Sequence, residues 1–353
     1  MILLFQTCRN SMFPPMTHDQ PDLFASSAGP AAPVDVAPQA ANWTKTAERL
    51  PDTLRMGTSS WSFPGWAGLV YDRDAPPGLL SRHGLTAYAR HPLLRAVGVD
   101  RSYYEAPPKR VFADYARQVP DDFRFMVKAQ RDLLTPGHPK FLDAEWAKEC
   151  IIEPTCAGLG HKLGTLLLQF APLRPGEMER HLKSPRHFAE RLYRFMTALT
   201  PELGSASGQR PALTVELRTP ALFTEDYAQA LHHAGATHGY VVHPSMLTLE
   251  KQAALIPVIP PTPVAPASST TPPLLIRWML APGARYEAAK EAWAPFTRMQ
   301  QPDPSNRRAI TYLLKAATHA GRQAMLIVNN KAEGSSPESI AALATEWVDG
   351  QIR

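Results

Sequence analysis

From Leu54 to the C-terminus, short apolar runs alternate with longer amphipathic stretches. The apolar runs are typical of strands covered on both faces, and the stretches between them place apolar residues at helical spacing. The predicted strands span residues 54–60, 96–104, 123–129, 164–170, 212–218, 238–244, 274–280 and 323–330. Because a parallel return needs a long crossover, this alternation predicts a parallel α/β sheet. Eight such units in about 300 residues match a single closed (β/α)8 barrel of the TIM type.

Helix-capping signals support the alternation. Ser184 and Pro185 open one predicted helix, Thr224 caps another that Gly235 ends, and Ser336 precedes Pro337 at the start of the last. The rival fold is an open doubly wound sheet, which we expect to carry a Gly-rich phosphate loop after its first strand. Neither GxGxxG nor GxxxxGK[ST] occurs in the sequence.

Composition divides the chain into a leader and a barrel. Residues 1–52 are rich in Pro, Ala, Ser and Asp without an apolar period, which predicts a disordered leader before a barrel domain over 53–353. Residues 256–273 are Pro-rich and are interpreted as a loop insertion, because proline removes ladder donors. The opening "MILLF" is too short for a membrane span, and three irregularly placed cysteines fit a reducing compartment, so we expect a cytoplasmic protein that does not interact with membranes.

The charge balance permits an anionic ligand. The chain has 37 basic and 32 acidic residues, a net charge of +5; removing the leader's three basic and five acidic residues leaves 34 against 27, or +7. Cys150, Cys156 and His161 lack a fourth ligand and paired CxxC spacing, a poor match to a zinc site. We therefore predict neither a metal nor a cofactor.

The run "ALTVELRTP" carries the strongest candidate site. If Leu213 and Val215 pack under the helices, alternation points Thr214, Glu216 and Arg218 into the barrel. Desolvating an acid and a base costs several kcal/mol per ion, which a plain packed core has no reason to incur. The functional interpretation is a positioned carboxylate with an anion-binding arginine. The alternative is a structural ion pair that ties strand to strand.

Lys128 follows the same logic at the end of "FRFMVKA". A lysine there binds an anion, or forms a Schiff base when burial lowers its pKa; the alternative is a side chain that snorkels at the rim. Further polar residues stand at the ends of other predicted strands: Tyr103, Tyr104, Gln169, Arg277, Asn329 and Asn330. Since strand ends in such barrels meet at one mouth, these residues predict a shared binding site.

The stretch "MGTSSWSFPGWAGLVY" follows the first strand. Gly57 lets a backbone approach a ligand, and Trp61 and Trp66 offer flat surfaces that stack on a sugar ring or a nucleobase. The alternative is that both tryptophans are hydrophobic plugs of the barrel.

Six motifs in order give the chain its resemblance to a known family: "MGTSSWSFPGWAGLVY", "VDRSYYEAP", "FRFMVKA", "GTLLLQFAP", "TVELR" and "VNN". From about Leu54 to the C-terminus the sequence resembles the YecE-like barrel family, a domain of unknown function. The resemblance implies a TIM-type barrel. It also implies matches to family positions at Trp61, Trp66, Tyr104, Lys128, Gln169, Glu216, Arg218, Arg277, Asn329 and Asn330. The sequence departs from the family at Gly98, Asp100 and Pro136, where Glu, Asn and His are usual.

The leading hypothesis is an enzyme that acts on a small polar or anionic organic molecule by acid/base chemistry at the barrel mouth. Glu216 would transfer the proton if a partly dry site beside Trp61 raised its pKa, a shift that Arg218 would oppose, while Lys128 and Arg218 neutralise charge. Hydrolysis, isomerisation and lysis stay open. Two alternatives are a nucleic-acid-binding or repair-related barrel and a non-catalytic ligand-binding protein. The sequence leaves the oligomeric state undetermined.

Overall fold

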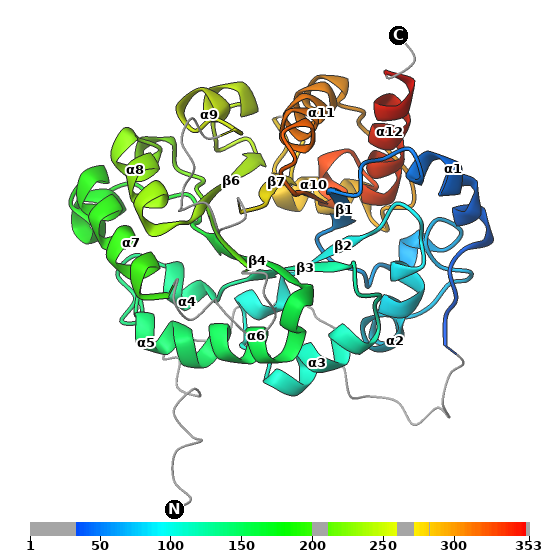
Figure 1. Ribbon diagram of the computed structural model, residues 1–353, viewed down its shortest axis with the longest axis horizontal. Helices are drawn as coiled ribbons and strands as arrows, with labels where there is room; N and C mark the ends of the chain where they lie inside the picture. Colours follow the sequence, from blue (N-terminus) through cyan, green and yellow to red (C-terminus); the bar gives the residue numbers. More distant parts are fainter. Residues whose placement is uncertain (1–32, 200–210, 260–271, 282, 351–353) are drawn as a thin grey trace, which may run out of the picture.

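The fold is a closed barrel of eight parallel strands, paired in chain order (Figure 1). The computed structural model describes residues 33–199, 211–259, 272–281 and 283–350. The strands are β1 Leu54–Thr58, β2 Ala96–Val99, β3 Arg124–Lys128, β4 Leu163–Gln169, β5 Ala212–Glu216, β6 Thr237–Val242, β7 Leu274–Trp278 and β8 Ala324–Val328. Each predicted strand is present, and β1 closes the barrel by pairing with β8. The predicted TIM-type barrel is confirmed.

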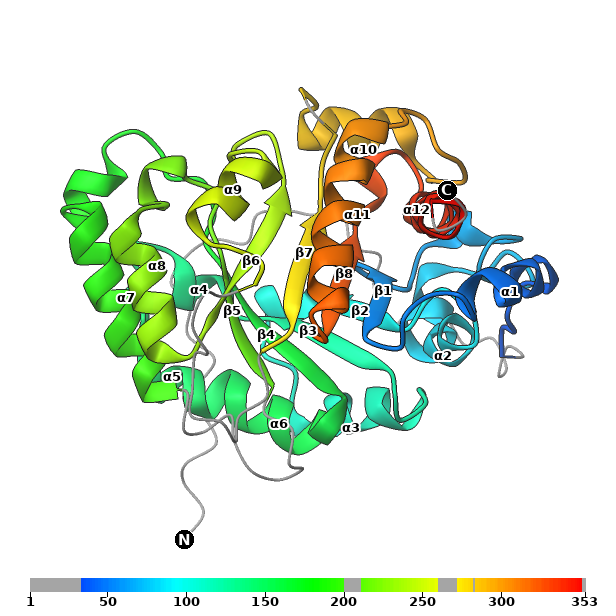
Figure 2. The ribbon, with the colours of Figure 1, turned by 45° about the horizontal axis from the view of Figure 1, so that its top comes forward.

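Helices surround the strands on the outside of the barrel (Figure 2). They are α1 Thr44–Ala47, α2 Pro77–Ala89, α3 Lys109–Arg117, α4 Arg131–Leu134, α5 Ala144–Ala147, α6 Glu153–Leu159, α7 Pro185–Leu199, α8 Glu225–Ala234, α9 Leu249–Leu255, α10 Tyr286–Trp293, α11 Pro304–His319 and α12 Ser336–Asp349. The predicted cap of α8 is confirmed: Thr224 accepts a hydrogen bond from the Tyr227 amide at 3.3 Å, and Gly235 ends the helix in the left-handed conformation.

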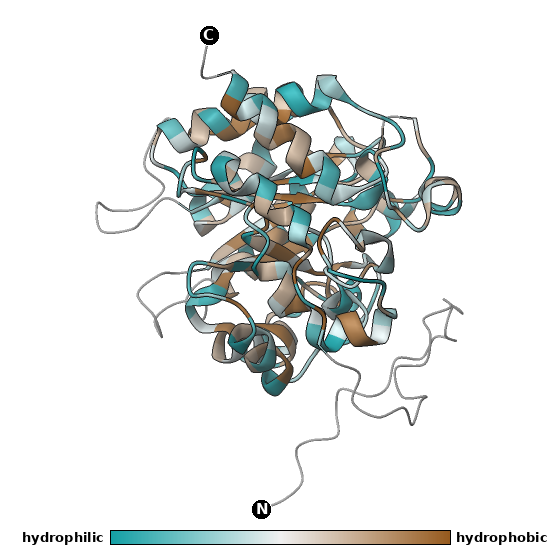
Figure 3. Ribbon diagram, turned by 90° about the vertical axis from the view of Figure 1, so that its right-hand side faces the viewer, coloured by the Kyte–Doolittle hydropathy of each residue, from teal (hydrophilic) through white to brown (hydrophobic). Residues whose placement is uncertain are grey.

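Strand alternation creates two separate apolar clusters. Leu213, Val215 and Leu217 belong to the large cluster between the strands and the helices. Met126 and Leu275 belong to a small cluster inside the barrel. The hydropathy colouring shows the same arrangement, with apolar segments at the centre and hydrophilic segments concentrated toward the outside (Figure 3). The inward-facing side chains are therefore apolar in the middle of the barrel. The candidate site lies beyond this apolar layer, at the carboxyl ends of the strands.

The prediction of a disordered leader up to residue 52 is wrong over residues 33–52. This segment forms a 3-10 helix, Pro38–Trp43, followed by α1. Ala37 and Ala40 are buried, and the Ala37 amide donates to the Val70 carbonyl at 2.9 Å. Small side chains let this segment pack closely on the loop after β1, although its composition offers few large apolar residues. Residues 1–32 of the predicted leader lie outside the described residues.

Most of the predicted Pro-rich insertion, residues 260–271, also lies outside the described residues. Its described flanks are tied to Arg322, whose Nε donates to the Pro272 carbonyl at 2.8 Å and whose Nη1 donates to the Val258 carbonyl. Across the described ranges, no helix combines the length and apolar character that a membrane span requires.

Candidate functional site

An Arg–Glu–Arg triad lies at the carboxyl ends of β5 and β7. Glu216 is fully buried, and its two carboxylate oxygens accept hydrogen bonds from Arg218 Nε and Arg277 Nη1, each at 2.8 Å. The Arg277 side chain is only 1% exposed, whereas that of Arg218 is 14% exposed. The prediction that Glu216 and Arg218 point into the barrel is confirmed, and Arg277 joins them from 61 positions further along the chain.

Asp100 and Lys128 complete the charged group. Asp100 Oδ1 lies 3.8 Å from Arg277 Nη2, and its side chain is 34% exposed. The Lys128 ammonium lies 3.6 Å from the centre of the Tyr103 ring. We call Asp100, Lys128, Glu216, Arg218 and Arg277 the mouth cluster. Four of the eight strands or the turns directly after them contribute to it, as the sequence predicts for strand ends that meet at one mouth.

The pKa of Glu216 moves in the direction opposite to the one expected. Burial by itself raises this pKa, but the charges and hydrogen bonds of Arg277 and Arg218 outweigh burial and lower it to about 2. The carboxylate is therefore ionised at neutral pH and is a weak base. Arg277, in turn, has its pKa raised by Glu216 and Asp100 in spite of burial. Glu216 is better suited to holding two arginines than to transferring a proton.

Lys128 has the perturbed pKa that acid/base chemistry needs. Burial lowers its pKa to about 8; Arg277 and Arg218 act in the same direction, and Asp100 and Glu216 oppose them. Among the described residues, no carboxylate lies within 4.0 Å of its ammonium, which lies against the ring of Tyr103. The side chain is only partly buried.

His243 follows β6 and belongs to the same electrostatic neighbourhood. Burial lowers its pKa to about 4, with Arg218 and Arg277 acting in the same direction and Glu216 opposing. Its Nδ1 lies 2.8 Å from the Ser245 hydroxyl. His243 is therefore neutral near pH 7 and is already paired within its own loop.

Three further predicted residues lie at strand ends or in the turns that follow them. Gln169 pairs in register with Glu216 across β4 and β5. Asn329 Nδ2 donates to the Ser59 hydroxyl at 2.9 Å, which joins the ends of β8 and β1. Tyr104 is 67% exposed and stacks edge-on against Tyr103. Tyr103, rather than Tyr104, contacts Lys128.

The structure does not bring Trp61, Trp66 and Asn330 into this group. Both tryptophans are buried in the large apolar cluster outside the strands, where Trp61 Nε1 donates to the Leu80 carbonyl at 3.1 Å. Asn330 Oδ1 accepts hydrogen bonds from the amide and the hydroxyl of Ser336 at the start of α12. Both tryptophans are therefore packed as buried hydrophobic residues and present no exposed ring face to a ligand.

Two glycines have structural explanations. A Cβ on Gly57 would lie 1.7 Å from the Ala96 carbonyl oxygen, so the close approach is to β2 and not to a ligand. At Gly98, a Cβ would lie 3.0 Å from Met126 Cε and 3.2 Å from the Ser59 backbone. Met126 thus occupies the interior space beside β2.

Lys331 is a residue that the sequence reasoning missed. It follows the Asn pair in the 3-10 helix η9, Asn330–Ala332, and is only 5% exposed. Its ammonium lies 4.0 Å from the centre of the Tyr286 ring. The signal available in the sequence was a lysine directly after "VNN", at the end of the last strand.

A closed parallel barrel with its ionisable groups gathered at the strand carboxyl ends defines the class of TIM-type barrel proteins with a mouth site. Within this class, the chain belongs to the DUF72 family, described as a protein of unknown function, whose model matches residues 55–351. This is the family called YecE-like above. No curated protein matches the sequence.

Solved structures of this family are similar to the chain. One crystal structure of a DUF72 family protein from Enterococcus faecalis V583 has 18% identity, covers 84% of this chain and 95% of that chain, and gives a TM-score of 0.50. A DUF72 family protein from Thermotoga maritima MSB8 has 17% identity, covers 85% of this chain and 99% of that chain, and gives a TM-score of 0.46. At these identities the likeness concerns the fold alone.

Proposed function

We propose that this protein is an enzyme that acts on a small anionic organic molecule at the barrel mouth. In this proposal Lys128 exchanges a proton with the substrate, and Arg218 and Arg277, held by Glu216, bind its anionic group. The observation that carries the proposal is the arrangement of the mouth cluster: Glu216 and Asp100 hold two arginines there, and a third cation, the Lys128 ammonium, has no carboxylate partner among the described residues.

The arginines are suited to binding rather than to proton transfer. A guanidinium stays protonated and presents several donors in one plane, and Glu216 accepts from one nitrogen of Arg218, Nε, and one of Arg277, Nη1. The remaining N–H groups of Arg218, which is partly exposed, are available to a carboxylate or phosphate at the mouth. The triad therefore supports a rigid anion-binding group.

Lys128 is suited to proton transfer because its pKa of about 8 lies near neutral pH. At pH 7, roughly a tenth of the amine is neutral and able to accept a proton, compared with less than about a thousandth for an unperturbed lysine. Binding an anion raises the pKa of this amine, so Lys128 would also be able to act as the acid. Hydrolysis, isomerisation and lysis each use such a group.

The test compares variants in a ligand screen and then in an activity assay. Metabolites that raise the melting temperature of the wild type are titrated by calorimetry against Lys128→Met and Arg218→Met. Lys315→Met is the matched control, because Lys315 also lies over a ring, that of Trp347, at 5.3 Å, but on the outer helices. We expect Arg218→Met to lose binding and Lys128→Met to lose turnover. Binding and turnover that are unchanged in both variants would contradict the proposal.

A further inference from the structure

Lys331 is held in place through its backbone. Its amide donates to Asn329 Oδ1 at 3.0 Å, and its carbonyl accepts from the Ala281 amide at 2.9 Å. These two bonds tie η9 to the end of β8 and to the loop after β7. The position of the Lys331 Cα is therefore fixed at the same end of the barrel as the mouth cluster.

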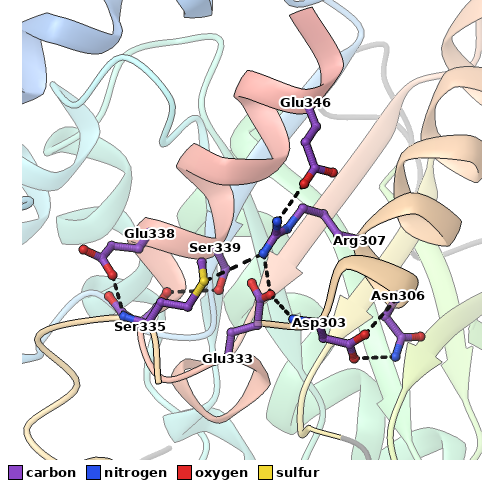
Figure 4. Close-up of polar contacts among 9 residues, drawn as sticks. Asp303, Asn306, Arg307, Glu333, Ser335, Glu338, Ser339 and Glu346 are labelled. Atoms are coloured by element: carbon purple, nitrogen blue, oxygen red, sulfur yellow. Dashed lines mark hydrogen bonds and ion pairs between the residues drawn. The ribbon is translucent and has the colours of Figure 1, made fainter. Parts of the chain in front are cut away.

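A buried ionic network fixes the other side of this loop (Figure 4). Glu333 is fully buried and accepts from Arg307 Nη2 at 2.5 Å and from the Asp303 amide at 2.6 Å. Arg307 Nη1 also donates to Glu346 on α12 at 2.7 Å. The segment that carries Lys331 is thus anchored to α11 and α12, which makes it a rigid support for a binding group.

Lys331 is only 5% exposed, and among the described residues no carboxylate neutralises its ammonium. Among the described residues no carboxylate lies within 4.0 Å of it, and its contacts are the rings of Tyr286 at 4.0 Å and Phe296 at 5.5 Å. Aromatic rings attract a cation but do not cancel its charge. Burial lowers the pKa of Lys331 to about 8, with Lys290 adding to this effect and Glu287 and Asp100 opposing it. A buried charge of this kind is costly unless something neutralises it.

Asp100 connects Lys331 to the mouth cluster. This one carboxylate raises the pKa values of Lys128, Arg277 and Lys331, so it lies within electrostatic reach of all three cations. The ring under Lys331 belongs to Tyr286, whose pKa is raised by burial first and also by Asp100, whereas Arg218 lowers it. Adding Lys331 to the mouth cluster gives four cations against two carboxylates, a formal charge of 4 − 2 = +2.

We propose that Lys331 and Tyr286 form a second anion subsite beside the mouth cluster, so that the ligand carries two anionic groups, as a dicarboxylate or a phosphorylated carboxylic acid does. One group would bind at Arg218 and Lys128 and the other at Lys331. This inference rests on the proposed function, because it extends the same site. The surplus of two positive charges matches a ligand with two negative ones.

The experiment uses the full chain and a series of small acids. Acetate and propionate are compared with malonate, succinate and glutarate, and inorganic phosphate with phosphonoacetate, by calorimetric titration at pH 7. We expect at least one dianion to bind about tenfold more tightly than the monoanions, the gain that one additional charge-assisted contact provides. Lys331→Met should abolish this gain and leave the binding of monoanions unchanged, whereas Lys331→Arg and the control Lys315→Met should retain it.

The outcomes separate this inference from the proposed function. A dianion gain that survives Lys331→Met, or no gain across the series, overturns the second subsite and leaves the first one standing. Loss of dianion and monoanion binding together in Arg218→Met supports the shared site. If no acid binds in a manner that depends on Lys128 or Arg218, the proposed function itself fails. Should Lys331→Met not fold, Lys331→Gln, which retains a polar head group without the charge, is judged by the same comparison.

Discussion

Replacing Glu216 by Gln tests the central ionic arrangement most directly. The substitution keeps the side-chain volume and removes the charge, so the change in the free energy of unfolding includes no contribution from a new cavity. Arg277, 1% exposed, would retain only Asp100 at 3.8 Å, and Arg218 would lose the carboxylate that holds its Nε. Breaking a buried pair by removing one partner costs about 3–5 kcal/mol. We expect about 3 kcal/mol, the lower end of that range, because Asp100 and solvent at Arg218 offset part of the loss.

The assay is urea unfolding together with calorimetry. With about 2 cal/mol/K of unfolding entropy per residue, a chain of this size loses roughly 4–5 °C in melting temperature for 3 kcal/mol. Glu190→Gln is the matched control, because the pair of Glu190 with Arg186 lies on the exposed face of α7 at 3.3 Å and should contribute less than about 0.5 kcal/mol.

A double-mutant cycle and a pH series refine this test. Glu216→Gln combined with Arg277→Met should cost less than the sum of the two single changes by more than about 1 kcal/mol, because the stranded guanidinium is gone. The folded-state pKa of Glu216, about 2, lies below its ordinary value of 4.5. Its stabilisation is therefore present above pH 4.5 and is lost as pH falls toward 2. Additive single changes, or wild-type stability in Glu216→Gln, would refute the reasoning.

Three other predictions concern the scaffold. Burial lowers the pKa of His238 to about 4 from 6.5, so the stability that it contributes is complete above pH 6.5 and is lost as pH falls from 6.5 toward 4; His238→Gln should flatten unfolding free energies over that window. Gly57→Ala should cost about 2 kcal/mol or more in urea unfolding, because its Cβ would lie 1.7 Å from the Ala96 carbonyl. Arg307→Met should lower the melting temperature by about 5 °C, because it leaves Glu333 buried without its cation.

Controls for these scaffold variants come from the same chain. Gly78→Ala, in the first turn of α2 with no atom within 4 Å of the new Cβ, should be neutral or slightly stabilising. His232→Gln, on the exposed side of α8, should change the unfolding free energy by less than about 0.5 kcal/mol. A loss of stability in Gly78→Ala as large as that in Gly57→Ala would contradict the steric explanation.

The strands and caps were predictable because their signals are local. Apolar runs, and residues such as Thr224 and Gly235 at helix ends, act over a few positions. The inward direction of Glu216 also followed from alternation along one strand. The sequence did not predict that residues 33–52 are ordered, because their structure depends on contacts such as that of Ala37 with Val70, which composition does not reveal.

The aromatic residues show most clearly which parts of the site could not be predicted from the sequence. Trp61 and Trp66 have the same apolar surface whether they line a ligand or pack under a helix, and only the path of the loop after β1 buries them. Tyr103 and Tyr104 are adjacent in sequence, yet the turn η3, Arg101–Tyr103, places the first over Lys128 and leaves the second exposed. Two adjacent residues in a turn can point in different directions, and the composition of the turn does not reveal which of them contacts the lysine.

The sequence by itself determined the barrel, its strand order and the inward direction of strand residues such as Glu216, because period and capping are properties of neighbouring residues. Only the tertiary structure decided the chemistry of those side chains. Glu216 has a pKa of about 2 because Arg277 comes from a distant strand, and Lys331 lies beside the mouth because the barrel closes β8 against β1. Electrostatic energy depends on distances in space, which the closure of the barrel sets and the linear order of residues does not.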